Sequence, residues 1–330
     1  MPRPVRFVAS FHSVPTFAEW RAMAVDAERL GYYGINRDDH FWPPTLAQPE
    51  DAWPECFTLL SALAAVTSRV RITQTVTCNA YRHPGLLAKI VSTLDWISEG
   101  RAELGIGAGW YRPEFEAYGY DYPKPSVRIA MLQESVKIIK SLWTEPRTTF
   151  EGKYYTLKNA YSYPKPVQKP RPPIIIGGGG EKLLRVTAEE ADIANISMIF
   201  SAGEITPEGL KEHTEESFLR KRDTLHRHCD AIGRDPKEIK VAGQLFTMVS
   251  KDENIVKSVS EMTSAQVGLD PETARTLPNV AVGTPNQVID LLGERIEKLG
   301  IDSFVCTFLN PEIMEVFATD VMPHLNPVKP

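Results

Sequence analysis

Polar or glycine-rich segments follow several of the short apolar runs in this sequence, and some of their residues could carry chemistry. After the run that ends at Arg37, Asp39 and His40 place a carboxylate beside an imidazole. An imidazole gives or takes a proton near neutral pH, and a neighbouring carboxylate can fix its tautomer. In the alternative interpretation, Asp39 caps a turn and His40 is a polar loop residue. The pair is the first candidate for acid–base catalysis.

Residues 75–84 hold a second group of such side chains, in which Arg82 supplies a fixed positive charge. We place Arg82 among the candidate ligand-binding residues. Pro84 favours a helix start, because proline fits the first position of a helix. Alternatively, Arg82 pairs with a surface carboxylate and His83 caps that helix. Cys78 is interpreted as a packing residue, because no base is adjacent in the sequence.

Two glycine-rich segments could bring a flat ligand close to the backbone. Gly105, Gly107 and Gly109 are spaced as G-x-G-x-G, and Trp110 follows them as a stacking or space-filling residue. The acidic residue and βαβ spacing of a dinucleotide-binding fingerprint are missing. Residues 177–180 are four glycines before a predicted helix, where free N–H groups bind phosphate. A flexible turn is the alternative, but it needs only one or two glycines.

The elements that must position these segments form a repeating pattern. Short β-branched runs alternate with amphipathic stretches, as is typical of βαβ units around a parallel sheet. Eight strand–helix pairs without a linker favour an α/β fold of one domain over residues 1–330, a closed (β/α)8 TIM barrel. The predicted strands cover residues 5–10, 33–37, 70–77, 102–106, 173–176, 192–197, 239–249 and 303–308. Because the carboxyl ends of barrel strands meet at one face, we expect the candidate segments to lie together.

The predicted helices cover residues 17–30, 55–66, 86–97, 129–143, 218–232, 286–299 and 312–322. Residues 148–169 depart from the pattern, because aromatic residues there alternate with glycine and proline. This composition predicts a hairpin and an extended connection inserted before the fifth strand.

The composition of the chain argues against several classes of binding partner. The chain has 330 residues, a net charge of -5 and no basic block, so nucleic acid and an anionic membrane surface are not expected partners. No signal sequence or membrane-spanning run is recognised. The four cysteines fit neither a zinc site nor a disulfide framework, and a cytoplasmic protein without a metal is expected. A small molecule remains the expected partner.

Six motifs occur in a characteristic order between about residues 5 and 240. They are Asp39-His40-Phe41, Thr67-Ser68-Arg69, Tyr81-Arg82-His83-Pro84, Ser98-Glu99-Gly100-Arg101, the segment from Gly105 to Trp110, and Ile176-Gly177-Gly178-Gly179-Gly180. Together they resemble the bacterial luciferase-like flavin and deazaflavin oxidoreductases of the luciferase-like monooxygenase superfamily. The resemblance is greatest to the branch that uses coenzyme F420, an 8-hydroxy-5-deazaflavin.

The resemblance implies a dimeric barrel with the deazaflavin ring across the strand ends. Asp39 would contact the ring, His40 would donate the proton, and a non-prolyl cis peptide would join Thr75 to Val76. Gly177 and Gly178 would hold the phosphate, with Gly107 and Gly109 beside the tail. The full set of candidate cofactor-binding residues is Asp39, Thr75, Val76, Thr77, Arg82, Gly107, Ala108, Gly109, Trp110, Gly177, Gly178, Gly179 and Gly180.

One position departs from the family pattern. Sugar-phosphate dehydrogenases of the family carry a glutamate base directly after the glycines of the fourth strand, where this chain has Trp110. Glu114 could replace that base only if its helix points inward.

The resemblance implies hydride transfer between F420 and a small organic substrate, with His40 moving the accompanying proton. The alternatives are an FMN-dependent monooxygenase of the same superfamily and a barrel that binds a flavin without turnover. Substrate choice is expected to lie in three predicted loops, residues 42–53, 201–213 and 261–280.

Overall fold

A parallel barrel of strands forms the centre of the computed structural model, which describes residues 4–12, 14–44, 48–199, 203–204 and 206–326. The sheet order is β3-β2-β1-β12-β10-β9-β8-β5-β4, and a parallel bridge joins Ile72 of β3 to Ala102, just before β5, which closes the barrel. The strands are β1 (Arg6–Phe11), β2 (Gly34–Arg37), β3 (Arg71–Gln74), β4 (Thr77–Cys78), β5 (Leu104–Gly107), β8 (Ile174–Gly177), β9 (Ile193–Asn195), β10 (Lys240–Val249) and β12 (Ser303–Phe308). The predicted (β/α)8 architecture is confirmed.

The third barrel strand differs from its prediction. Residues 70–77 were expected as one strand, but the chain forms two short strands, β3 and β4, on either side of a cis peptide between Thr75 and Val76. The expected non-prolyl cis bond is therefore present. It turns the strand so that β3 pairs with β2 while β4 pairs with β5.

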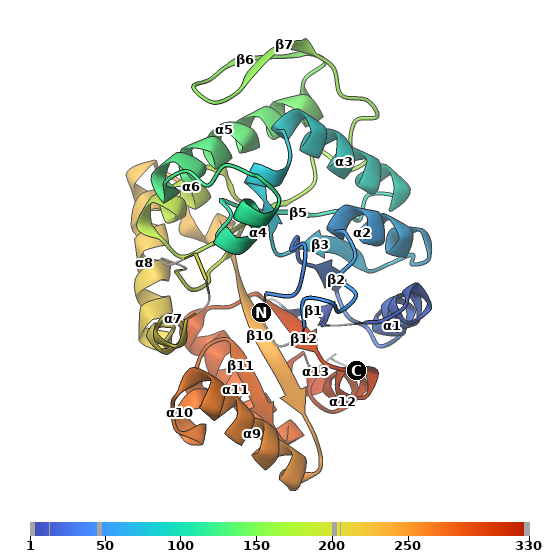
Figure 1. Cartoon of the computed structure of the whole chain (residues 1–330), viewed down its shortest axis with the longest axis vertical. Coiled ribbons are helices and arrows are strands. Elements are labelled where there is room, and N and C mark those ends of the chain that lie inside the picture. The colour runs from blue at the N-terminus through green and yellow to red at the C-terminus, as the bar shows by residue number, and fades with distance from the viewer. Residues whose placement is uncertain (1–3, 13, 45–47, 200–202, 205, 327–330) are drawn as a thin grey trace.

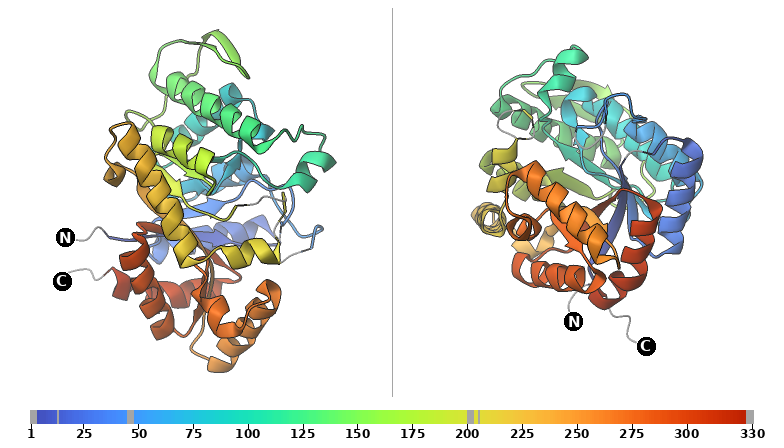
Figure 2. Two further views of the ribbon diagram at one scale, coloured as in Figure 1. Left: turned by 90° about the vertical axis from the view of Figure 1, so that its left-hand side faces the viewer. Right: turned by 60° about the horizontal axis from the view of Figure 1, so that its bottom comes forward.

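Helices surround the strands on the outside (Figures 1 and 2). The longer ones are α1 (Phe17–Arg29), α2 (Cys56–Ala65), α3 (Pro84–Ile97), α5 (Pro125–Thr144), α6 (Glu181–Glu190), α8 (Glu215–Ala231), α11 (Pro285–Leu299) and α12 (Pro311–Asp320). In α3, Leu87, Val91 and Leu94 are buried at helical spacing, so one apolar face packs on the sheet. The shorter helical segments are η1 (Asn79–Tyr81), α4 (Arg112–Ala117), η2 (Pro236–Glu238) and α13 (Met322–Leu325).

The inserted segment forms a hairpin away from the barrel strands, at the top of Figure 1. Its strands β6 (Thr148–Glu151) and β7 (Thr156–Ala160) are antiparallel and make a separate two-stranded sheet. The prediction for residues 148–169 is confirmed in its hairpin part, and an irregular connection follows it to β8.

The region before β12 contains more helices and strands than the sequence predicted. Residues 261–280 were expected as a loop, but helices α9 (Glu253–Val267) and α10 (Pro271–Thr276) occupy most of this range. A further strand, β11 (Val280–Gly283), pairs with the carboxyl-terminal half of β10. Its four residues, VAVG, are too short to show a period in the sequence.

The other two predicted substrate loops are only partly described. Residues 45–47 of the first loop and residues 201, 202 and 205 of the second lie outside the described residues. The second contains helix α7 (Pro207–Glu212), which was not predicted.

The described ends of the chain meet on one side of the barrel, where the amide of Val5 donates a hydrogen bond to Oδ1 of Asn326 at 2.8 Å. Among the described residues, no helix is long and apolar enough to cross a lipid bilayer. The buried side chains form one main apolar cluster that connects strands and outer helices.

Gly105 is required by the packing of neighbouring strands. A Cβ atom at this position would lie 1.7 Å from the carbonyl oxygen of Gln74, a backbone atom that cannot move without breaking the barrel. Gly293, on α11, is the opposite case, because a Cβ atom there would meet no heavy atom within 4 Å.

We expect Gly105→Ala to lower the free energy of unfolding by at least ~3 kcal/mol, because the new methyl group overlaps the backbone. Gly293→Ala, the control, should raise it by about 0.5–1 kcal/mol, because alanine is the better helix former. Urea denaturation measures both. Equal stability of Gly105→Ala and the wild type would contradict the packing described.

Candidate active site

A cavity of about 540 Å³ lies at the carboxyl ends of the barrel strands. This volume is typical of a site for a small molecule or a cofactor. Of the predicted site residues, the cavity is lined by Asp39, His40, Thr75, Val76, Thr77, Gly107, Ala108, Gly109, Trp110, Gly177, Gly178, Gly179 and Gly180. The structure therefore brings together the segments that sequence reasoning singled out.

Arg82 lies behind the cavity wall. Its guanidinium donates to both carboxylate oxygens of Asp39, at 2.7 and 2.9 Å, and also to Glu55 at 2.7 Å. The amide of Cys78 donates a third hydrogen bond to Asp39. Burial raises the pKa of Asp39, and these three hydrogen bonds act in the opposite direction. Arg82 thus fixes the orientation of the buried Asp39 and does not itself line the cavity, contrary to the prediction. Its ion pair with the exposed Glu55 agrees with the alternative, in which it binds a surface carboxylate.

His83 has the capping role of the alternative interpretation. Its Nδ1 accepts a hydrogen bond from the amide of Gly85 at 3.1 Å, at the start of α3. Cys78 is buried, and burial raises the pKa of its thiol. Packing therefore explains Cys78, as expected.

Glu114 points inward from α4 and is fully buried. Its Oε2 lies 3.0 Å from Nδ1 of His40 and accepts a hydrogen bond from the Tyr81 hydroxyl at 2.7 Å. Its Oε1 accepts a hydrogen bond from the amide of Phe41 at 2.6 Å. A carboxylate four residues after Trp110 therefore faces His40.

Glu114 changes the acid–base properties of His40. Burial lowers the pKa of His40, but the hydrogen bond to Glu114 and the charges of Asp38, Glu114 and Asp39 outweigh it and raise that pKa above its ordinary value. Because Nδ1 faces Glu114, the Nε2 atom is the ring nitrogen left to exchange a proton with a ligand. Trp110 and Tyr111 contact the imidazole edge to face and restrict its rotation.

Val76 forms the floor of the cavity together with two glycines. A Cβ atom on Gly107 would lie 2.8 Å from Cγ2 of Val76, and one on Gly177 would lie 2.7 Å from Cγ1. These two glycines therefore make room for the side chain that the cis peptide presents. Nε2 of Gln244 donates to the carbonyl oxygen of Thr75 at 3.1 Å and supports the same peptide.

The glycine turn after β8 leads directly into α6. Gly178 has a φ of 143°, which favours glycine, and Gly180 is the N-cap of the helix without a side-chain cap. A Cβ atom on Gly180 would meet no heavy atom within 4 Å. Open space therefore lies beside the start of α6, the kind of place where backbone N–H groups bind anions.

Sequence reasoning missed several residues of the cavity wall, among them Asn195, Gln244 and Arg128, whereas Tyr81 belongs to a motif that it had singled out. Asn195 is 2% exposed, and its Nδ2 has no hydrogen-bond partner among the described residues. Such a donor in a cavity wall is typical of a site that binds a ligand carbonyl. Asn195 and Gln244 end or lie within strands, and no motif marks them.

These features fit a flavin or a deazaflavin. The apolar floor at Val76 and the unpartnered amide of Asn195 suit a planar ring with carbonyl groups, and the glycine turn suits its phosphate. Val76, Asn195 and the glycine turn are the residues of the cavity wall that would hold such a cofactor.

Comparison with known proteins identifies the family. The family model described as luciferase-like monooxygenase matches residues 6–303. The chain belongs to this family. The expectation drawn from the six motifs is confirmed.

Relatives in the family use two cofactors. An F420-dependent glucose-6-phosphate dehydrogenase of Kineococcus radiotolerans is 36% identical over 170 residues, or 51% of this chain and 49% of the relative. The chain thus spans about half the length of the F420-dependent relatives that it matches. The FMNH2-dependent dimethylsulfone monooxygenase of Pseudomonas putida is 24% identical over 326 residues, or 92% of this chain and 86% of the relative.

Solved structures share the barrel. The coenzyme F420-dependent tetrahydromethanopterin reductase of Methanopyrus kandleri superposes with a TM-score of 0.76 at 19% identity, over 98% of this chain and all of that one. An EDTA monooxygenase superposes with a TM-score of 0.78 at 16% identity, over 98% of this chain and 94% of that one. At these identities the likeness establishes the fold.

Glu114→Gln should lower the pKa of His40, because the neutral amide removes the charge that stabilises the imidazolium. Titration of His40 by nuclear magnetic resonance measures the change. Glu116→Gln, on the exposed side of the same helix, is the control and should leave the His40 pKa unchanged. An unchanged pKa in Glu114→Gln would contradict the pairing.

The same pairing predicts a pH dependence of stability. The pKa of His40 is higher in the folded than in the unfolded chain, so protonation of His40 stabilises the folded state. This stabilisation is fully present at a pH below the pKa of the unfolded chain, and it is lost as the pH rises through the pKa of the folded chain. In Glu114→Gln, this part of the pH dependence of the unfolding free energy should become smaller.

Proposed function

We propose that this protein is an F420-dependent oxidoreductase that transfers a hydride between the deazaflavin and a small organic substrate. The observation that carries the proposal is the His40–Glu114 pair at the wall of the 540 Å³ cavity. The 36% identity with an F420-dependent dehydrogenase supports the choice of cofactor.

The deazaflavin supplies a hydride donor or acceptor when it is bound. His40 exchanges the accompanying proton with the substrate through Nε2, and Glu114 stabilises the protonated imidazole. Asp39, held by Arg82, would contact the ring, and the unpartnered amide of Asn195 would donate to a carbonyl of the cofactor. Val76 would lie against the ring, while Gly177, Gly178, Gly179 and Gly180 would bind the phosphate. Trp110 limits the space beside His40.

An FMN-dependent monooxygenase is the second candidate function. The match to the dimethylsulfone monooxygenase favours it, because that match extends over 92% of this chain. The identity is lower, at 24%, and a proton-donating pair suits hydride transfer directly. A barrel that binds the cofactor without turnover would not need the buried Glu114 to face His40.

We further propose that the protein acts as a homodimer in the cytoplasm, without nucleic acid or membrane partners. The family resemblance supports the dimer, and the net charge of -5 supports the choice of small-molecule partners.

Purified apoprotein should bind F420 more tightly than FMN, with quenching of the deazaflavin fluorescence, because the site is proposed to accept the deazaflavin with its full phosphate-linked tail. Titration with each cofactor gives the two dissociation constants. Tight binding of FMN without binding of F420 would reject the F420 assignment and favour the monooxygenase.

His40→Ala should lower turnover about 100-fold or more while the cofactor dissociation constant stays within about threefold, because the proton transfer is lost. His83→Ala is the matched control, since it removes a nearby imidazole that only caps α3. It should lower the unfolding free energy by about 1 kcal/mol and leave turnover unchanged. Equal turnover in His40→Ala and the wild type would remove His40 from the mechanism.

A further inference from the structure

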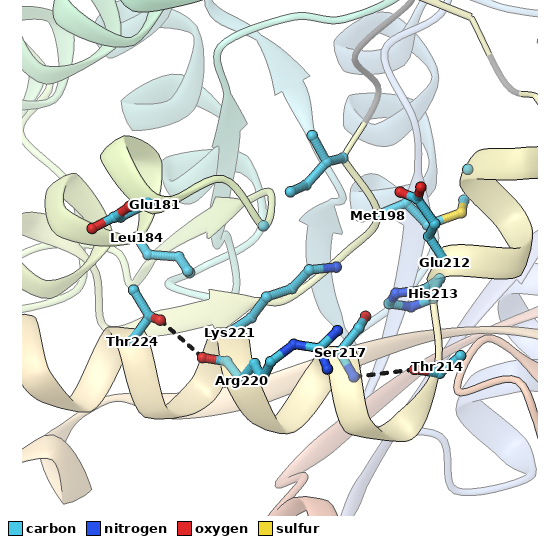
Figure 3. A pocket seen from close by; sticks show the side chains of 13 residues that line it. Glu181, Leu184, Met198, Glu212, His213, Thr214, Ser217, Arg220, Lys221 and Thr224 are labelled. Atoms are coloured by element: carbon cyan, nitrogen blue, oxygen red, sulfur yellow. Dashed lines mark hydrogen bonds between the residues drawn. The ribbon is translucent and has the colours of Figure 1, made fainter.

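A second cavity, of about 620 Å³, lies beside the first and shares Gly179, Met198 and Ile199 with it. Helix α8 forms one wall, and the glycine turn before α6 forms another (Figure 3). The two cavities meet where the phosphate of the proposed cofactor would lie. The second cavity is therefore in position to hold the part of the cofactor beyond that phosphate.

Two buried polar side chains in the wall of this cavity lack a partner. His213 is 5% exposed and Ser217 is 6% exposed, and neither Nδ1 of His213 nor Oγ of Ser217 has a hydrogen-bond partner among the described residues. Buried polar groups are normally paired, so each unpaired group requires an explanation. Figure 3 shows both side chains directed toward the end of Lys221.

Lys221 brings a positive charge to the same place. Its Nζ donates to the carbonyl oxygen of Ser197 at 2.9 Å, and no carboxylate of the described residues lies within ion-pair distance of it. Burial lowers the pKa of Lys221 to about 8, and Arg220 acts in the same direction, so the ammonium group is still mainly protonated at pH 7. A Cβ atom on Gly179 would lie 3.0 Å from Cδ of Lys221, which places the lysine stem against the glycine turn.

The other charged groups in the wall of the second cavity do not pair with Lys221. Arg220 already pairs with Glu216 at 2.5 Å, and the carboxylates of Glu181 and Glu212 line the cavity without an ion pair to Lys221. Burial, Lys221 and Arg295 lower the pKa of His213 to about 3, so its imidazole is neutral and can present an N–H group. Lys221, Ser217 and His213 together offer three donors to one oxyanion.

We propose that Lys221, Ser217 and His213 bind a carboxylate of the glutamate tail that F420 carries beyond its phosphodiester. This inference rests on the proposed function and goes further, because it names the protein residues that would distinguish F420 from FMN. The phosphate of FMN is terminal, so FMN has no group to place in the second cavity.

The test compares dissociation constants of the apoprotein for F420 with several glutamates, for the same molecule without glutamates, and for FMN, each by fluorescence titration. The wild type should bind the glutamylated form about tenfold more tightly than the form without glutamates. Lys221→Met should abolish this difference and leave the affinity for the form without glutamates within about threefold. Ser217→Ala should reduce the difference without loss of thermal stability, because the hydroxyl has no partner in the protein.

Arg227→Met is the control, since it removes a positive charge from the exposed side of α8. It should retain the full effect of the glutamates, and all variants should show the circular dichroism of the wild type. Equal affinity of the wild type for the two forms of F420, or a full glutamate effect in Lys221→Met, would overturn the inference while the proposed function stands. Failure of the wild type to bind either form would overturn both.

Discussion

The contact between Val76 and the glycines of the neighbouring strands is the constraint on which the site depends. The cis peptide at Thr75–Val76 divides the third barrel strand and turns the valine side chain toward β5 and β8. Gly107 and Gly177 leave the space that this side chain fills, to within 3 Å of where their Cβ atoms would be. Val76, Gly107 and Gly177 all line the cavity at these strand ends.

The two residues of the acid–base pair come from separate segments of the chain. His40 follows β2, and Glu114 comes from the short helix α4 after β5. Their 3.0 Å contact joins residues 74 positions apart, and Tyr81 from a third segment binds the same carboxylate. Because three loops contribute to one hydrogen-bonded group, the barrel that positions the loops also sets the protonation of His40.

The sequence was sufficient to predict the barrel because its strands and helices have clear periodicities and its glycines and prolines mark their ends. It was less informative where an element is short or where tertiary pairing decides the structure. β11 has four residues and α10 has six, too few to show a period, and the helical spacing of Ile255, Val259 and Met262 in α9 was overlooked. Residues 261–280 were therefore wrongly taken as a loop. The division of β3 from β4 follows from one peptide bond, which periodicity does not reveal.

For the site, residue types pointed to Asp39, His40 and the glycine turn, whereas their partners depend on distant contacts. Glu114 was expected to act only if its helix points inward, and the structure meets that condition. Asn195 and Gln244 carry no sequence signal, since an amide in a strand is not distinctive until a cavity surrounds it.

In the proposed complex, a deazaflavin ring lies on Val76 within reach of His40. A crystal structure of the protein with F420 tests this placement most directly. We expect electron density for the ring above Val76, with a ring edge near Asn195 and the reactive face open toward Nε2 of His40. Density for the ring at another place, or a rim closed by side chains at saturating F420, would contradict it.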